Sequence, residues 1–207
     1  MAITTYAELK TSITDFLNRD DLTTVTPTFI SLAEADMQRR VRHWRQEKRS
    51  NANLNSRYSD VPGDFLEVIR FGVTGDNNST LEMISQSQML DRRMQNGNTS
   101  GSPRYYALTA GEIELFPSPS AITSTELYYY SKIDALSAST ASNWMLENHP
   151  DAYLYGSLVH SAPYLSDDSR ITMWAALYQA AIDAINAESE SVKFGGSGRR
   201  LNIRGLS

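Results

Sequence analysis

The clearest periodic pattern of apolar positions lies near the C-terminal end of the chain. Ile171, Trp174, Tyr178, Ala181 and Ile185 recur at spacings of three and four residues. Such spacings place side chains on one face of a helix, because an α-helix has about 3.6 residues per turn. The pattern predicts an amphipathic helix that extends to about residue 186.

A second helix is predicted immediately before this one. Pro150 suits a first helical position, because its missing N–H has no partner there in any case. An apolar stripe follows at Leu154, Leu158, Ala162 and Leu165. Pro163 should kink or end the helix, since it cannot donate to the preceding turn. Residues 166–169 form a short turn, in which Asp168 or Ser169 can cap the next helix, so the two helices should pack antiparallel.

The N-terminal part of the chain carries two further helix signals. Thr5 and Glu8 have the spacing of a capping box and predict a first helix that ends near Asn18. The pair Thr26 and Pro27 indicates a second start, a cap followed by proline at the first helical position. The apolar stripe of this second helix consists of Ile30, Ala33, Met37, Val41 and Trp44.

Basic residues gather toward the end of this second helix. Arg42, Arg45 and Arg49 share a face when the helix is continued, and Arg39, Arg40 and Lys48 lie beside them. One interpretation is a basic helix that faces DNA or an acidic partner. Another is a solvated face whose cations lie near the helix C-terminus, where the helix dipole favours them. In an oligomeric ring, the same arginines could pair with the carboxylates of a neighbouring subunit.

The middle of the chain has the pattern of β-structure. Strands are predicted at 67–73, 81–84 and 125–132, a short helix at 85–94, and a Gly/Asn/Ser-rich loop at 96–103. Residues 104–109 and 112–116 form a predicted hairpin around the turn Ala110-Gly111. Alternation directs Ile113 and Leu115 to one face and places Glu112 and Glu114 together on the solvent face.

Together these elements predict an α+β fold that is mainly a helical bundle with a small inserted antiparallel β subdomain. The expected parts are N-terminal bundle helices at 1–50, a β-rich subdomain at 51–135, a C-terminal helical hairpin at 136–193, and a C-terminal arm at 194–207. The arm is rich in glycine and contains three arginines and no acidic residue. It fits either a frayed terminus or an extended segment that becomes ordered on a partner.

Composition excludes several classes of protein. A formal net charge of −5 counts against general nucleic-acid binding. It fits a surface past which a polyanion such as DNA can move without being bound. The chain has no cysteine, so it has no disulfide or thiolate chemistry. No run approaches the ~20 apolar residues of a membrane span, and the N-terminus lacks the pattern of a signal peptide. We therefore expect a protein of a cytoplasm, or of a particle assembled there.

Catalytic and metal-binding patterns are weak. His149 and His160 would lie about 16 Å apart along a continuous helix, too far to share a metal, and His43 is the remaining histidine. Phosphate-binding, zinc-protease and serine-hydrolase motifs do not occur. The carboxylate pairs are Glu112 with Glu114 and Asp167 with Asp168, and a solvent face and a capping turn explain them. The sequence therefore predicts no enzyme, no cofactor and no metal site.

The region from Asn143 to Asn186 nevertheless resembles a known family. The matching strings are Asn143–Leu146 (NWML), His149–Gly156 (HPDAYLYG), Ala162–Arg170 (APYLSDDSR), Trp174 and Tyr178–Ala181 (YQAA). They resemble tailed-bacteriophage head-to-tail adaptor proteins, which include head-completion connectors and gatekeeper-like tail tubular proteins. In that family a Trp-Leu motif precedes an "HPD-hydrophobic-Y" helix, a "PYL-x-DD-x-R" turn and a helix with Trp and Tyr.

The resemblance implies a structural protein of the virion head–tail junction, assembled in the host cytoplasm. It implies a homo-oligomeric ring of about twelve copies, which docks on the phage portal protein, extends its DNA channel and binds tail, nozzle or tail-completion proteins. Double-stranded DNA would pass through the lumen without sequence-specific binding, and no membrane would be involved. The arm would bind the portal through Phe194, Arg199, Arg200, Leu201, Ile203 and Arg204. Arg42, Arg45 and Arg49 would make inter-subunit or channel contacts.

Two alternatives stay open at this point. One is a DNA-binding module that uses the basic helix 39–49, which predicts strongly salt-dependent binding to duplex DNA. The other is a tail-associated cell-wall hydrolase, for which Glu112 and Glu114 are the candidate carboxylates.

Overall fold

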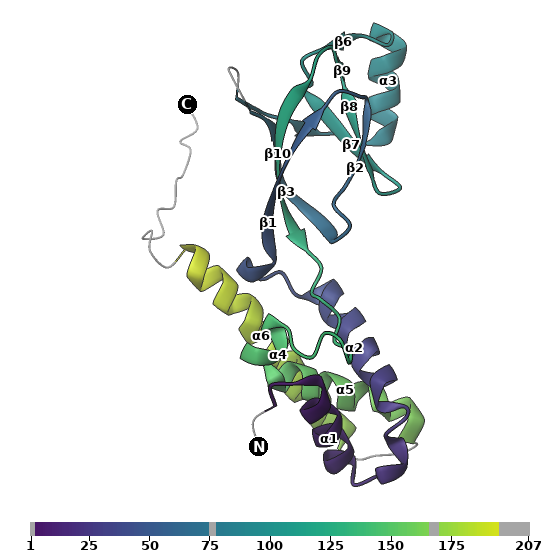
Figure 1. The fold of residues 1–207 in the computed structure, drawn as a ribbon, viewed down its shortest axis with the longest axis vertical. Coiled ribbons are helices and arrows are strands. Elements are labelled where there is room, and N and C mark those ends of the chain that lie inside the picture. The colour runs from purple at the N-terminus through teal and green to yellow at the C-terminus, as the bar shows by residue number, and fades with distance from the viewer. Residues whose placement is uncertain (1–2, 75–77, 166–169, 195–207) are drawn as a thin grey trace, which may run out of the picture. The chain divides into compact units, whose positions relative to one another are not determined.

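A computed structural model describes residues 3–74, 78–165 and 170–194. The chain divides into two compact units. The first, here called the helical unit, consists of Met1–Arg45 and Ile133–Ser207. The second, called the β unit, is Gln46–Lys132. Figure 1 shows the elements of both units along the chain.

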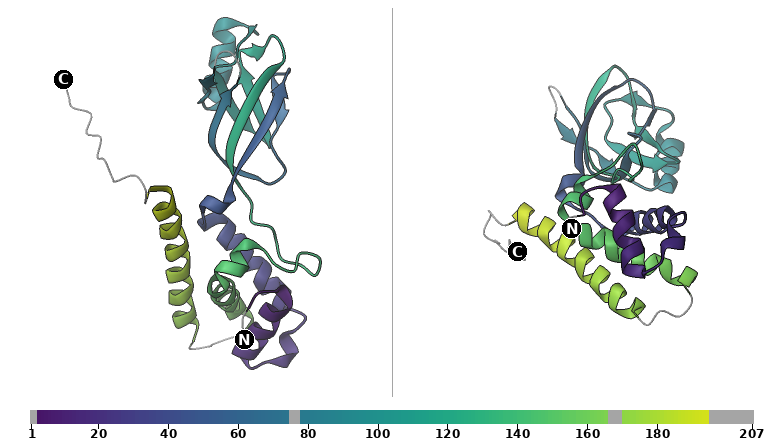
Figure 2. Two further views of the ribbon diagram at one scale, coloured as in Figure 1. Left: turned by 60° about the vertical axis from the view of Figure 1, so that its left-hand side comes forward. Right: turned by 60° about the horizontal axis from the view of Figure 1, so that its bottom comes forward.

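The helical unit is built from helices contributed by both ends of the chain. They are α1 (Tyr6–Leu17), the 3-10 turn η1 (Asp20–Leu22), α2 (Thr26–Arg40), α4 (Trp144–Asn148), α5 (Pro150–Leu165) and α6 (Ile171–Phe194). Their apolar faces form one core, to which α5 contributes Ala152, Tyr153, Leu154 and Leu158. Helix α5 packs against both α2 and α6. Figure 2 shows these helices from two further directions.

Local sequence signals account for most of the helix ends. The capping box is confirmed: Thr5 Oγ1 accepts from the N–H of Glu8, and the Glu8 carboxylate accepts from the N–H of Thr5. Pro150 is the first residue of α5, as predicted, and α5 ends two residues after Pro163. Thr26 differs from the prediction, because it is the first residue of α2 and its hydroxyl donates to the Leu22 carbonyl oxygen. The proposed caps Asp168 and Ser169 lie outside the described residues.

The β unit contains two four-stranded sheets and one short helix. One sheet has the order β1 (Glu47–Leu54), β10 (Thr123–Ser131), β3 (Phe65–Val73), β4 (Ser79–Thr80). The other has the order β2 (Tyr58–Asp60), β8 (Glu112–Phe116), β7 (Tyr105–Thr109), β5 (Glu82–Met83). A small pair joins β6 (Ser100–Gly101) to β9 (Ser118–Pro119), and α3 spans Gln86–Asn96.

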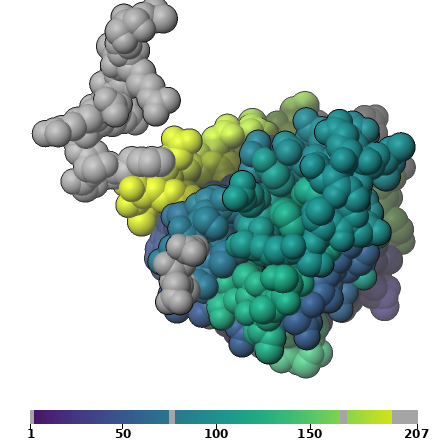
Figure 3. All heavy atoms as spheres, turned by 90° about the horizontal axis from the view of Figure 1, so that it is seen from above, coloured from purple at the N-terminus to yellow at the C-terminus, as the bar shows by residue number. Residues whose placement is uncertain are grey.

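Two clusters of apolar side chains stabilise the β unit. One contains Phe71, Leu115 and Leu127, which are almost completely buried. The other lies under α3 and joins Met89 to Ala107 and Phe116. In the space-filling view of Figure 3, the teal and green segments of the β unit form one continuous surface. This unit therefore has its own core.

The expected fold class needs a correction. The chain is α+β, but the prediction of a mainly helical bundle with a small β subdomain is wrong, because the structure is 48% helix and 26% strand. Strand β1 was the main omission, since its sequence EKRSNANL has no apolar alternation. Ser50 and Ala52, which share a face with the buried Leu54, are small, and they pair with Leu127 and Thr125 of β10. A polar strand at a sheet edge is common, because charged side chains there discourage edge-to-edge pairing.

No described helix has an apolar stretch of the length that a bilayer crossing requires.

Candidate functional site

The basic residues predicted to share one long helix lie on different elements. Helix α2 ends at Arg40, and Val41 has extended backbone angles of φ −93° and ψ 130°. Arg42 follows in an irregular segment, Arg45 lies in the 3-10 turn η2 (Trp44–Gln46), and Arg49 lies in β1. The prediction of a continuous basic helix through residue 49 is therefore wrong. The common face proposed for these arginines does not exist.

Asn186 of α6 holds the chain at the point where α2 ends. Its Nδ2 donates to the carbonyl oxygen of Arg40 at 3.2 Å, and its Oδ1 accepts from the N–H of Arg42 at 3.1 Å. Ser189, one turn later on α6, accepts from the N–H of Trp44 at 2.9 Å. These bonds satisfy backbone groups that a longer helix would have paired internally. Contacts with a distant helix thus override the local helical pattern. Residues 41–45 are called the junction segment below.

The arginines of the junction segment make contacts within the helical unit. Arg42 Nη1 donates to the carbonyl oxygens of Gln38 at 3.1 Å and Val41 at 2.8 Å. The Arg45 guanidinium lies 5.0 Å from the centre of the Trp44 ring, within the range of a cation–π contact. These contacts stabilise the junction segment itself.

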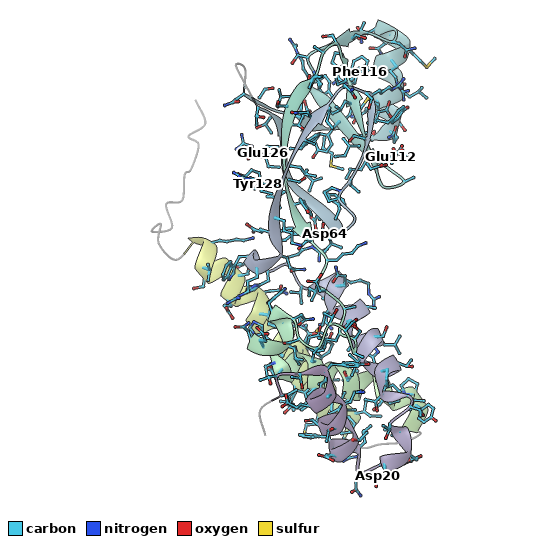
Figure 4. All side chains as sticks on the ribbon, in the orientation of Figure 1. Asp20, Asp64, Glu112, Phe116, Glu126 and Tyr128 are labelled. Carbon is cyan, nitrogen blue, oxygen red and sulfur yellow. The ribbon has the colours of Figure 1, made fainter. Side chains whose placement is uncertain are left out.

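Lys48 and Arg49 are paired within the β unit. Lys48 Nζ lies 2.6 Å from Asp64 Oδ2, and Arg49 Nη1 lies 3.4 Å from Glu126 Oε1. Figure 4 labels both acidic residues. Asp64 also accepts from the Tyr129 hydroxyl, and burial together with this bond raises the pKa of Tyr129 to about 12. Arg49 and Glu126 lie on the paired strands β1 and β10, so their contact supports the register of that pair. Lys48 connects β1 to the turn that precedes β3.

Sequence spacing missed a cluster of two imidazoles and one carboxylate in the helical unit. His43 Nε2 and His149 Nε2 each lie 3.7 Å from a different oxygen of Glu188. The His43 ring is fully buried, and it stacks on Trp144 at 4.9 Å with an interplanar angle of 17°. The three residues come from the junction segment, the α4–α5 connection and α6. No linear motif could have revealed them, because each lies in a different region of the sequence.

The cluster has the residue types of a metal site, but its hydrogen bonding argues against one. All three ligand atoms lie within 4.8 Å of one another. The N–H of Arg45, however, donates to His43 Nδ1 at 3.3 Å. A neutral imidazole that accepts at one nitrogen carries its proton on the other, and a metal-bound histidine normally donates through its second nitrogen. His43 Nε2 therefore carries a proton, and at 3.7 Å from Glu188 it makes an electrostatic contact. A protonated nitrogen cannot bind a cation, so this geometry argues against a metal site.

This cluster predicts a specific pH dependence of stability. Burial lowers the pKa of His43 below its usual value of 6.5, and the Glu188 charge opposes this only in part. The folded state thus binds this proton less readily than the unfolded state, so stability present above pH 6.5 is lost as the pH falls. Between pH 7.5 and 5.5 we expect the free energy of unfolding to fall by ~1 kcal/mol more in the wild-type protein than in the His43→Gln variant. Urea titrations followed by tryptophan fluorescence measure this, since Trp44, Trp144 and Trp174 all belong to the helical unit. Parallel pH profiles of the two proteins would contradict it.

The carboxylates of the β8 hairpin differ from the prediction. Glu112 is exposed, as expected, but Glu114 is 2% exposed. The Glu114 Oε1 atom accepts from Arg57 Nη2 at 2.7 Å and lies 3.1 Å from Arg93 Nη2. The predicted alternation of side chains between the two faces of β8 was correct. Helix α3, which carries Arg93, covers the face that we expected to be exposed to solvent. Figure 4 shows Glu112 and Phe116 at the two ends of this strand.

These contacts weaken the hydrolase alternative. A glycosidase requires two carboxylates that flank a substrate. Glu114 instead binds two guanidinium groups inside the unit, so the pair with Glu112 does not form such a site. The second candidate pair, Asp167 and Asp168, lies outside the described residues.

The residues of the matched motif have structural roles. Arg170 Nη1 donates to the carbonyl oxygen of Phe16 at 2.9 Å, and its guanidinium lies 4.8 Å from the Trp174 ring centre. The Tyr178 hydroxyl donates to Asp36 of α2 at 2.8 Å, and burial, with that carboxylate, raises the pKa of Tyr178. The motif therefore fixes α6 against α1 and α2.

Tyr153 is the centre of a second buried network. Its hydroxyl donates to Glu34 at 3.2 Å and accepts from Asn143 Nδ2 at 2.7 Å. Burial is the main cause that raises the pKa of Tyr153, and burial also raises the pKa of Glu34. The network connects α2, α4 and α5.

Of the predicted C-terminal arm, the part of the chain that the structure describes includes Phe194 alone. Phe194 is the last residue of α6. Arg199, Arg200, Leu201, Ile203 and Arg204 lie outside the described residues, so their predicted portal contacts stay a prediction.

Comparison with known proteins gives one family match. The family model described as "SU10 adaptor protein" matches residues 4–201. The match includes the whole β unit and every described helix. No curated protein sequence matches the chain.

Proposed function

Because the chain belongs to the SU10 adaptor family of phage head-to-tail adaptor proteins, we propose that it forms a ring of about twelve copies between head and tail. The membership confirms the resemblance found in residues 143–186. The family is structural, and its members are virion components that associate with other phage head and tail proteins.

The proposed ring docks on the portal, continues its DNA channel and presents a surface to tail proteins. The observation that carries this proposal is the length of the family match, which runs from residue 4 to residue 201. Three carboxylates have structural roles inside the fold. Glu114, Glu34 and Asp36 each bind groups of their own unit.

The DNA-binding alternative loses its main support. It required six basic residues on one helix, but α2 ends at Arg40, and Lys48 and Arg49 lie in β1 beside carboxylates. The net charge of −5 also disfavours binding to duplex DNA.

Cryo-electron microscopy of the native particle tests the proposal. We expect a ring of this chain between portal and tail, with a central channel wide enough for duplex DNA. A particle in which the chain occupies another position, or from which it is absent, would contradict the proposal.

A truncation tests the arm separately. Removing residues 195–207 should leave the stability of both units unchanged, because the apolar cores of both units consist of residues before 195. Attachment to the portal should be lost, since the arm carries arginines and alternating apolar residues that suit an extended binding segment. Co-sedimentation with purified portal measures attachment, and thermal unfolding provides the control. Undiminished co-sedimentation would refute the role of the arm and spare the adaptor assignment.

A further inference from the structure

The side of α6 that faces away from the core carries a continuous apolar surface. Met173 is 55% exposed and Leu177 is 39% exposed. Ala180, Ala184 and Ala187 continue the row and are also exposed. The spacings alternate between four and three residues, which places all five positions on one straight seam suited to a second helix. These five residues are called the α6 seam.

The α2 helix of the same copy does not cover this seam. Tyr178, Gln179 and Asn186 are residues of α6 that bond to α2. Tyr178 lies one position after Leu177, a rotation of about 100°, whereas Gln179 and Asn186 each lie two positions after a seam residue, a rotation of about 200°. The seam therefore faces away from α2. In Figure 2, α6 lies along one side of the helical unit.

Helix α2 carries an exposed uncharged surface of its own. Leu32 is 46% exposed, and Thr28, Ser31 and Ala35 beside it are exposed as well. These four residues are called the α2 patch. At its C-terminal end lies Arg39, whose side chain is 67% exposed.

The two surfaces are complementary in shape. The C-terminal half of the seam consists of alanines, which leave room for a large side chain from a closely packed helix. Leu32 is the large residue of the α2 patch, and small residues surround it. Leu177 can in turn pack near Thr28, at the start of the patch.

They are also complementary in direction and charge. Within one copy α2 and α6 are parallel, because Asp36 contacts Tyr178 and Arg40 contacts Asn186 further along both helices. Rotation about a ring axis turns each copy by only about 30° relative to the next in a ring of about twelve copies, so α6 would meet the α2 of the next copy in nearly that parallel direction. When Leu32 then lies on the alanines, Arg39 lies near the acidic C-terminal half of α6.

We infer that the α6 seam of one copy binds the α2 patch of the next copy, an inference that rests on the ring proposed above. A ring requires two different patches on each subunit that fit one another. Asp183, Glu188 and Glu190 are exposed acidic residues beside the seam. Glu188 also contacts His43 and His149 of its own copy, so Asp183 and Glu190 are the ones that would approach Arg39 of the neighbour.

Disulfide trapping tests this contact, because the chain has no cysteine of its own that could form a competing bond. The double variant Leu32→Cys with Ala180→Cys, oxidised in isolated head–tail connector complexes, should give a ladder of covalent multimers on non-reducing gels. The matched control is Thr11→Cys with Ala180→Cys, since Thr11 is exposed on α1. The control should remain monomeric on the gel.

The outcomes separate this inference from the proposed function. A ring that is visible by electron microscopy but gives no ladder, or the same ladder in the control, would overturn the helix contact and leave the adaptor ring in place. Connector complexes without a ring of this chain would overturn the proposed function itself. Ladder formation in the test variant alone supports both.

Discussion

Replacing Glu114 with glutamine is expected to lower the free energy of unfolding of the β unit by about 3 kcal/mol. Glu114 is buried on β8, and its Oε1 accepts from Arg57 and lies beside Arg93. The neutral amide would leave two guanidinium groups without their counter-charge. Both arginine side chains are 21–23% exposed, so water compensates in part, and we expect the lower end of the range for a broken buried ion pair.

The matched control is Glu112→Gln, two residues earlier on the same face of β8. Its side chain is exposed, so its effect should stay within about 0.5 kcal/mol. Urea unfolding followed by far-UV circular dichroism measures the loss, and tryptophan fluorescence reports on the helical unit in the same sample. Equal effects of the two substitutions would show that the arginine contacts do not stabilise the unit.

A valine at position 156 should destabilise the helical unit by about 3 kcal/mol, the upper range for overpacking a filled core. Gly156 lies in the middle of α5, between α2 and α6. A Cβ atom there would lie 2.9 Å from Tyr178 Cε2 and 3.3 Å from Ala33 Cβ. Tyr178 cannot easily move, since it is 4% exposed and bonded to Asp36.

The Gly156→Ala variant tests whether a side chain at this position stabilises or destabilises the protein. In an exposed helix alanine would add about 1 kcal/mol of stability over glycine, whereas here the close contacts should make the change unfavourable. Ala7→Val on the exposed side of α1 controls for the helix propensity of valine and should cost only about 0.5 kcal/mol. Thermal unfolding measured by tryptophan fluorescence ranks the three variants. A stabilised Gly156→Ala protein would contradict the close packing of α5.

Elements defined by neighbouring residues could be predicted from the sequence. The Thr5 capping box, the proline start of α5 and the β7–β8 hairpin all depend on residues within a few positions of one another. The face of β10 that carries Leu127 and Tyr129 also follows from simple alternation. Short-range hydrogen bonding and side-chain periodicity are sufficient for these features.

Features defined by distant residues could not be predicted. The end of α2 depends on Asn186, and the environment of His43 depends on Glu188. The burial of Glu114 depends on α3. The position of α3 over β8 cannot be predicted from the alternation of apolar and polar side chains along that strand. Strand β1 was missed because an edge strand with small inward residues lacks the apolar pattern that identifies strands. The α+β class was therefore predictable, but the size of the β unit was not.

The division of the chain also sets an order of folding. The β unit is continuous, whereas the helical unit needs segments from before residue 46 and after residue 132. In the β unit, Glu47 pairs with Tyr130, so the two points where the chain enters and leaves are adjacent once the sheet forms. The entropic cost of closing a loop grows with the logarithm of its length. A preformed β unit therefore lowers the cost of bringing the two segments of the helical unit together by about 2–3 kcal/mol. During synthesis all residues of the β unit are made before α4 to α6, so the β unit can form first and bring the chain at residues 46 and 132 close together.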